Sequence, residues 1–240
     1  MRGTALIVVG FVVGCAQAGK QDNSRGGSET VDSGNGGGTI YMDAPAEQHH
    51  DAGMGSGSGS GACTPMQIEM LKNPSFDLAP VGTLWTQAPY DPAYPVVTAD
   101  VGITQQSAPY YAWMGGLQGS DYGVSTCTDT LYQDIAIPAT ATALVLTGYY
   151  EVRTGETGST IYDSGSLALT QTNGTVIESV YTAQQLNNAH PTTTWTAINH
   201  TFTNVPAGQT VRLFFTTSND VSNPTSFYFD SLSLKAMACP

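Results

Sequence analysis

The stretch Ser226-Phe227-Tyr228-Phe229-Asp230-Ser231-Leu232-Ser233-Leu234 decides the fold. Its apolar side chains recur at every second position, which is typical of an extended strand with one face in a core. However, Phe227 and Phe229 fall on odd positions, whereas Leu232 and Leu234 fall on even ones. A regular strand would expose one of these pairs, because adjacent residues point to opposite faces of a sheet. We therefore predict a β-bulge at Asp230-Ser231, which returns both pairs to the core and re-aims the Asp230 side chain.

The same alternation extends through the chain upstream of this strand. Apolar residues share one parity within each of four further segments: Leu131, Ile135 and Ile137; Leu144, Leu146, Tyr150 and Val152; Leu167 and Leu169; Val211, Leu213 and Phe215. No segment shows a sustained helical period, and Gly, Pro and Asn separate the short alternating runs. Regularly spaced short strands with turn residues between them predict an all-β fold, a single antiparallel sandwich or barrel.

The N-terminus has the pattern of a targeting signal. Met1-Arg2 is followed by an uncharged apolar run from Ala5 to Val13, which is too short to span a bilayer. The run ends in Val12-Val13-Gly14-Cys15, which resembles a bacterial lipobox. We therefore interpret 1–14 as a lipoprotein signal peptide and Cys15 as the lipid-bearing residue. Ala16-Gln17-Ala18 offers an alternative site, and cleavage after Ala18 would release a secreted protein.

The next segment is a tether and not part of a core. Residues 15–62 contain the Gly/Ser runs around Gly34–Gly38 and Gly53–Gly61, a composition that behaves as flexible coil. We expect residues 63–240 to form the folded domain. The resemblance to lipoproteins implies a membrane partner through the lipid and a place in the cell envelope. In a Gram-negative cell this would be the outer membrane, because no Asp follows Cys15.

Three cysteines remain once Cys15 is assigned to the lipid. Cys63 and Cys239 bracket the domain, and the terminal strands of such sandwiches often lie side by side, so we predict a Cys63–Cys239 disulfide. This pairing leaves Cys127 as a free thiol. A Cys63–Cys127 bond is the alternative.

The charge excludes one class of partner. The chain has a formal net charge of −12, and from Cys63 onward it has four basic residues against thirteen acidic ones. Nucleic-acid binding needs clustered Lys and Arg to contact phosphates, so we expect no nucleic-acid partner. The acidity serves solubility or supplies ligands for a cation.

A series of short motifs resembles the galactose-binding-like jelly-roll domains that are appended to secreted bacterial peptidases and glycosidases. The series opens with Asn73-Pro74-Ser75-Phe76-Asp77 and Trp85, continues through Tyr110–Gly116 and Val205–Val211, and closes with Ser226–Asp230. Carbohydrate-binding modules are more distant relatives of these domains. The resemblance covers nearly all of Asn73–Leu234 and implies a single antiparallel jelly-roll β-sandwich, which we expect to be a monomer. One fold hosts many roles, so it does not by itself give the function.

The resemblance also implies a structural calcium site. Several relatives hold Ca²⁺ between the first and last strands, and Asp77 and Asp230 stand where the opening and closing motifs have their acids. Calcium prefers carboxylate and carbonyl oxygens as ligands. Ser231 occupies the position where relatives often have a second acid, and the alternative is that Asp77 and Asp230 only cap turns.

Aromatic residues suggest where a ligand would bind. Trp85, Tyr90 and Tyr94 lie in a segment with Pro89, Pro92 and Pro95, where exposure is expected, and exposed aromatic rings can stack on sugars. The alternative is that the aromatic residues of the strand motifs fill the core.

No catalytic residues are predicted. The domain has only His190 and His200 as histidines, and it has neither a Gly-x-Ser-x-Gly motif nor the spaced ligands of a zinc site. Glu151 and Glu156, which flank Arg153, would be the best acid pair for a glycosidase. We therefore expect a non-catalytic, surface-exposed lipoprotein that binds a glycan or another cell-surface polymer. An accessory envelope lipoprotein that contacts protein partners, without saccharide binding, is the alternative.

Overall fold

The computed structural model describes residues 63–90, 95–99, 103–116 and 126–239. The tether prediction for 15–62 and the signal prediction for 1–14 lie outside these residues. Every described element is a strand, and no helix long and apolar enough to cross a membrane occurs within them. The chain divides into two compact units, and all the strands belong to the unit that includes Thr64–Pro240.

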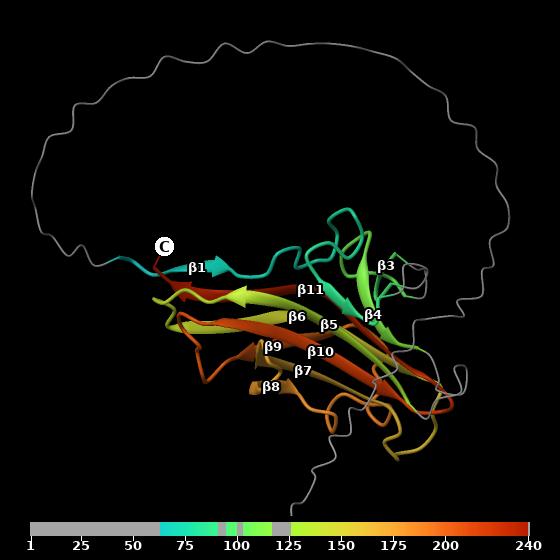
Figure 1. Cartoon of the computed structure of the whole chain (residues 1–240). Coiled ribbons are helices and arrows are strands. Elements are labelled where there is room, and N and C mark those ends of the chain that lie inside the picture. Colours follow the sequence, from blue (N-terminus) through green and yellow to red (C-terminus); the bar gives the residue numbers. More distant parts are fainter. Residues whose placement is uncertain (1–62, 91–94, 100–102, 117–125, 240) are drawn as a thin grey trace, which may run out of the picture. The chain divides into compact units, whose positions relative to one another are not determined.

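Two antiparallel sheets pack face to face, as the sequence pattern predicted (Figure 1). The six-stranded sheet has the order β3-β4-β11-β6-β9, with β1 also paired to β11. Its strands are β1 (Met66–Glu69), β3 (Val97–Thr98), β4 (Tyr111–Gly115), β6 (Ala143–Thr154), β9 (Thr196–Thr201) and β11 (Thr225–Ala238). Since β11 pairs with β1, β4 and β6, it organises this sheet.

The five-stranded sheet has the order β2-β5-β10-β7-β8. Its strands are β2 (Thr86–Ala88), β5 (Cys127–Ala136), β7 (Ser164–Gln171), β8 (Val176–Tyr181) and β10 (Thr210–Asn219). The central strand β10 pairs with β5 on one side and β7 on the other, with Phe214 opposite Tyr132 in the first pair. Strands far apart in sequence are therefore neighbours, which closes the two layers over one core.

The predicted bulge is present in β11. Its register against β6 shifts between Asp230 and Ser233, and Ser231 has a positive φ of 50°. The opposite position on β6 is Gly148, where an added Cβ would lie 2.7 Å from Leu232 Cδ2 and 3.1 Å from Leu232 Cα. A glycine is required there because the bulged backbone approaches too closely for any side chain.

The bulge keeps both halves of β11 in the core. Phe227, Phe229, Leu232 and Leu234 are all at most 2% exposed. The inward sets predicted for β5, β6, β7 and β10 are also buried, with Tyr150 partly buried against them. The sandwich therefore buries one continuous apolar interior, the dominant favourable contribution to folding.

The cysteine prediction was wrong for Cys127. Cys63, Cys127 and Cys239 are all disulfide-bonded, so Cys127 is not a free thiol. The error came from assigning Cys127 by elimination, after one bond and one lipid-bearing residue had been assumed. The Cys63–Cys239 pairing stays a prediction.

One carboxylate joins the edge strands of the two sheets. Glu178 on β8 accepts hydrogen bonds from His200 Nε2 on β9 (2.9 Å), from Thr203 N and Oγ1, and from Asn204 N. Burial raises the pKa of Glu178, but the hydrogen bonds from Thr203, Asn204 and His200 together outweigh it, so its pKa lies below the ordinary value. The contact therefore favours the ionised form.

We predict that Glu178→Gln lowers the free energy of unfolding by about 1–3 kcal/mol at neutral pH, because charge-assisted hydrogen bonds are lost. A lowered folded-state pKa contributes stability above the unfolded value, about 4.3, and this contribution is lost as the pH falls through the folded-state pKa. Urea unfolding at several pH values measures both effects. The wild type and the variant should converge in acid; a gap that persists there would show that the ionised carboxylate is not responsible.

Candidate functional site

Trp85 was expected to be an exposed ligand contact, and this expectation was wrong. The Trp85 side chain is only 6% exposed, and its ring packs against Phe76 (5.0 Å between centroids) and Phe215 (6.1 Å). Its Nε1–H donates to Asn73 O at 2.9 Å, which satisfies the buried indole. Trp85 therefore anchors the 73–85 segment to the core, and no face of its ring is available to a ligand.

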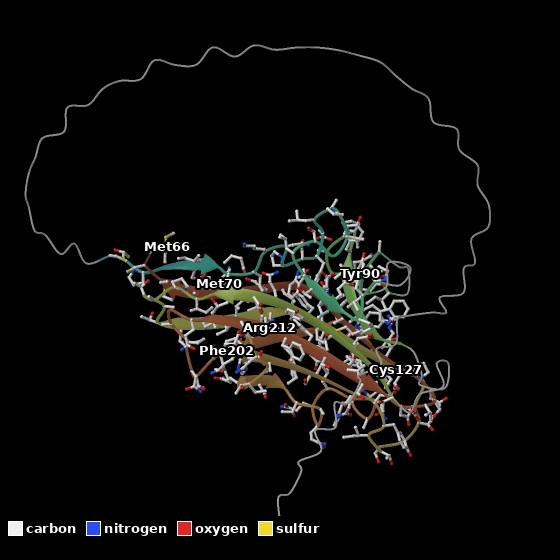
Figure 2. All side chains as sticks on the ribbon, viewed as in Figure 1. Met66, Met70, Tyr90, Cys127, Phe202 and Arg212 are labelled. Carbon is white, nitrogen blue, oxygen red and sulfur yellow. The ribbon has the colours of Figure 1, made fainter. Side chains whose placement is uncertain are left out.

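Tyr90 is exposed as predicted, whereas Tyr94 lies outside the described residues. The Tyr90 side chain is 65% exposed, just after β2. Figure 2 labels Tyr90 well apart from Arg212, which belongs to β10 of the five-stranded sheet. Tyr90 is thus a single exposed ring, without a second aromatic partner among the described residues.

Asp230, proposed as a calcium ligand, instead anchors a loop. It is fully buried, and its Oδ2 accepts hydrogen bonds from Gln106 N (2.8 Å) and Ser107 N (2.9 Å). Its Oδ1 accepts hydrogen bonds from Ser107 Oγ (3.0 Å) and Ser231 N (2.5 Å). Burial raises the pKa of Asp230, against the hydrogen bonds from Ser107, Ser231 and Gln106, which lower it.

Asp77 has a related role. Its Oδ1 accepts a hydrogen bond from Tyr110 N (3.0 Å), so Asp230 holds the middle of the 103–110 loop and Asp77 holds its C-terminal end. The donor N–H groups around Asp230 point at the oxygens that a cation would need, and an N–H donor and a metal ion compete for the same lone pairs. Among the described residues, no three His, Cys, Asp or Glu side chains form a group that could hold a metal ion. The oxygens of Asp230 and one oxygen of Asp77 are thus used in hydrogen bonds to the protein, and calcium at this pair stays a prediction.

The outer face of the five-stranded sheet has an aromatic and charged surface that the sequence analysis missed. Tyr132 on β5 and Phe214 on β10 are register partners whose rings lie 6.2 Å apart. Both point away from the core and are half-buried. The signal in the sequence was their parity: each is a large aromatic residue at a position where the alternation predicts a polar side chain.

A bidentate ion pair adjoins these rings. Arg212 Nε and Nη2 donate to Asp134 Oδ1 (2.7 Å) and Oδ2 (3.0 Å), and the guanidinium lies 3.6 Å from the centroid of the Tyr132 ring. The hydrogen bonds to Asp134 raise the pKa of Arg212. We call Tyr132, Asp134, Arg212 and Phe214 the outer-face cluster. The guanidinium covers one face of the Tyr132 ring, and the cluster places this cation, the Phe214 ring and a half-exposed carboxylate on one sheet face.

The residues considered for catalysis are used structurally. Glu151 is buried and accepts a hydrogen bond from Arg153 Nε at 2.6 Å. His190 Nδ1 lies 3.1 Å from Asn187 Oδ1, and His200 is hydrogen-bonded to Glu178, as expected for an ordinary surface histidine. Glu151, His190 and His200 are thus each held by a local contact, whereas Glu156 is placed through its backbone N, which donates to Thr154 Oγ1 (3.0 Å).

Asp77 and Asp230 give a matched test of the loop anchors. Asp230→Asn should lower the free energy of unfolding by about 2–4 kcal/mol, because an amide nitrogen replaces one of two acceptor oxygens that face donors in a buried site. Asp77→Asn should cost less than about 1 kcal/mol, since its remaining oxygen can still accept from Tyr110 N. Urea denaturation measures both values, and equal losses would contradict the difference in roles.

No protein-family model matches the sequence, and no curated protein matches it. Solved structures share the sandwich. An arabinose-bound GH51 α-L-arabinofuranosidase is 18% identical to this chain, with a TM-score of 0.43. The match covers 75% of this chain and 27% of the arabinofuranosidase, so this chain spans about a quarter of that enzyme's length. The TmCBM61 module in complex with β-1,4-galactotriose is 13% identical (TM-score 0.41), covering 70% of this chain and 97% of the module. The CBM22-1 xylan-binding domain of Paenibacillus barcinonensis is 12% identical (TM-score 0.41), covering 75% and 99%. At these identities the likeness concerns the β-sandwich fold alone.

Proposed function

We propose that this chain is a non-catalytic binding protein that holds carbohydrate on the outer face of its five-stranded sheet. The observation that carries this proposal is the outer-face cluster, in which two aromatic rings adjoin a bidentate arginine–aspartate pair. The remainder of that face adds hydroxyl groups, since Thr130 and Thr216 are register partners on the same side of the sheet. Aromatic rings beside fixed polar groups are the usual composition of a small-ligand site.

The chemistry of a sugar matches this arrangement. The C–H face of a pyranose packs on an aromatic ring, and its hydroxyl groups hydrogen-bond to planar charged groups at the edge of the ring. Arg212 uses two of its five N–H donors on Asp134, which fixes the guanidinium without consuming it. Because both residues lie on paired strands of a rigid sheet, little side-chain ordering remains to be done when a ligand binds.

A different surface favours the alternative, a protein partner. Leu78, Val81 and Leu84 are 52%, 42% and 52% exposed, and all three lie in the turn segment before β2. Large exposed apolar side chains that recur within one short segment are compatible with a protein contact surface. This surface is separate from the outer-face cluster in sequence, so the two functions can be tested independently.

We predict that the purified protein is retarded by soluble polysaccharide in affinity electrophoresis, using xylan, galactan, arabinan and mixed-linkage β-glucan as probes. Tyr132→Ala and Arg212→Ala should each weaken the retarding interaction about tenfold or more, equal to about 1.4 kcal/mol, because each removes a central contact. Isothermal titration with oligosaccharides of the retarding polymer gives the affinities.

Matched controls locate the site. Tyr162→Ala removes a 50% exposed tyrosine from a loop and should leave affinity unchanged, while Tyr90→Ala tests the ring predicted from sequence. Binding lost with Tyr90→Ala and kept with Tyr132→Ala would move the site to the β2 end. Absence of retardation by every probe would favour the protein-partner function instead.

We also propose that the protein is anchored in the cell envelope by lipid on Cys15. In the native bacterium, or in a host that processes lipoproteins, the wild type should partition into the detergent phase, and intact mass should include a diacylglycerol group. Cys15→Ser should move the protein to the aqueous phase because the thiol that receives the lipid is gone. Aqueous wild-type protein whose mass corresponds to cleavage after Ala18 would instead establish secretion.

A further inference from the structure

A pocket lies on the outer face of the six-stranded sheet, where β1, β11 and β6 are neighbours (Figure 1). On β6 and β11 its lining residues point away from the interior, because they alternate with the buried Leu144, Leu146 and Leu234. The pocket has a volume of about 240 Å³, and we call it the lysine pocket; it is lined by Gln67, Ala143, Val145, Thr147, Lys235 and Met237.

The pairing of the three strands explains the shape of the lysine pocket. Met237 on β11 lies opposite Gln67 on β1 and Ala143 on β6. Two positions earlier on β11, Lys235 lies opposite Val145. Long side chains on β1 and β11 thus stand beside short ones on β6, which leave a space that the long ones enclose. The lining combines three apolar side chains with an amide, a hydroxyl and an ammonium group.

The ammonium group of Lys235 has no carboxylate partner among the described residues. Its register partner on β1 is Glu69, the acidic residue best placed to pair with it. Both oxygens of Glu69 are used elsewhere. Oε1 accepts hydrogen bonds from Leu71 N (2.9 Å) and Leu234 N (3.0 Å), and Oε2 accepts one from Ser233 Oγ. The ion pairs within the described part of the chain use arginine and histidine side chains but not Lys235.

An unpaired cation at a pocket is unusual in so acidic a domain. From Cys63 onward there are thirteen acidic residues and four basic ones, and both arginines of this part are ion-paired. The side chains of Gln67 and Thr147 likewise make no hydrogen bond with another described residue, so their donors and acceptors are available. Recognition pairs opposite charges, so these groups together favour an anionic ligand that also carries polar groups.

We propose that the lysine pocket binds a small organic carboxylate. The Lys235 ammonium group donates charge-assisted hydrogen bonds to the carboxylate. Gln67 and Thr147 hydrogen-bond to further polar groups of the ligand, and Val145 and Met237 pack against its apolar part. The pocket is smaller than the sites of about 300–1,000 Å³ that hold drug-sized molecules, so the ligand is smaller still. Sugar acids and short aliphatic acids both have this chemistry.

The test is the binding of D-glucuronate, hexanoate and glucose to the full chain, measured by saturation-transfer difference NMR at neutral pH and low ionic strength. The wild type should bind at least one of the two carboxylates saturably, with a dissociation constant of about 1–10 mM. Glucose should bind about fivefold more weakly than that carboxylate, or not at all, because it has no charge for the ammonium group.

Three variants locate the binding. Lys235→Gln removes the charge and should weaken binding about fivefold or more. Ala143→Leu keeps every charge but fills the floor of the pocket, so binding should be lost. Lys72→Gln is the matched control, because Lys72 is the other lysine of the domain, is exposed and does not line the pocket. Its affinity should equal that of the wild type. None of the three positions belongs to the buried core, so the variants should fold.

Each outcome decides the proposal. Binding of glucuronate alone identifies a sugar acid as the ligand class, and binding of hexanoate alone identifies an aliphatic acid; either supports the proposal. No saturable binding of either carboxylate overturns it, and so does glucose binding as tightly as the carboxylates. Binding that Lys235→Gln retains, or that Lys72→Gln weakens equally, also overturns it, since the carboxylate would then bind elsewhere or respond to overall charge. The carbohydrate proposal concerns the other sheet and neutral polysaccharides, so each proposal can fail without the other.

Discussion

The register change in β11 is the constraint on which the rest of the structure depends. This strand pairs with β6 along most of its length, while its other edge is shared by β4 before the bulge and β1 after it. Without the extra residue, either Phe227 and Phe229 or Leu232 and Leu234 would face solvent. The bulge thus lets one strand serve two different neighbours and still present a single apolar face to the five-stranded sheet. The bulge also requires Gly148 on the opposite strand, because the bulged backbone occupies the space that a side chain would take there.

The bulge also determines the surroundings of Asp230, one of the two predicted calcium ligands. It leaves Asp230 pointing away from the core at the point where β4 gives way to β1, and a carboxylate buried there must find partners. The structure supplies them from the 103–110 loop, whose backbone N–H groups at Gln106 and Ser107 donate hydrogen bonds to the carboxylate. A loop is covalently attached, so this solution does not depend on the supply of an ion. Asp77 completes the same arrangement through Tyr110 N.

Much of the fold followed from side-chain parity, because alternation records directly which face of a strand is buried. The inward residues of five strands and the position of the bulge were predictable in this way. Long-range packing could not be predicted from parity. Trp85 lies in a proline-rich segment, and only the folded chain brings Phe215 against its ring. The same limit applies to Cys127, because a bonding partner depends on tertiary proximity. The outer-face cluster was missed for another reason. Tyr132 and Phe214 stand at outward positions, where the alternation is informative only if large aromatic exceptions are noted.

The inward polar side chains differ in how far their hydrogen-bonding groups are satisfied. At the centre of the sandwich, inward positions are apolar, and packing alone accounts for them. Gln133 is polar and inward, yet it is fully used: it bonds the backbone of Lys72 and Leu84 and fastens the segment before β2. Thr217 and Asn219 are inward in the same way but bond no equivalent backbone groups through their free oxygens. Buried polar atoms are costly unless hydrogen bonds compensate for their lost hydration, so Gln133 is a structural polar contact, whereas Thr217 Oγ1 and Asn219 Oδ1 remain without a hydrogen-bond partner.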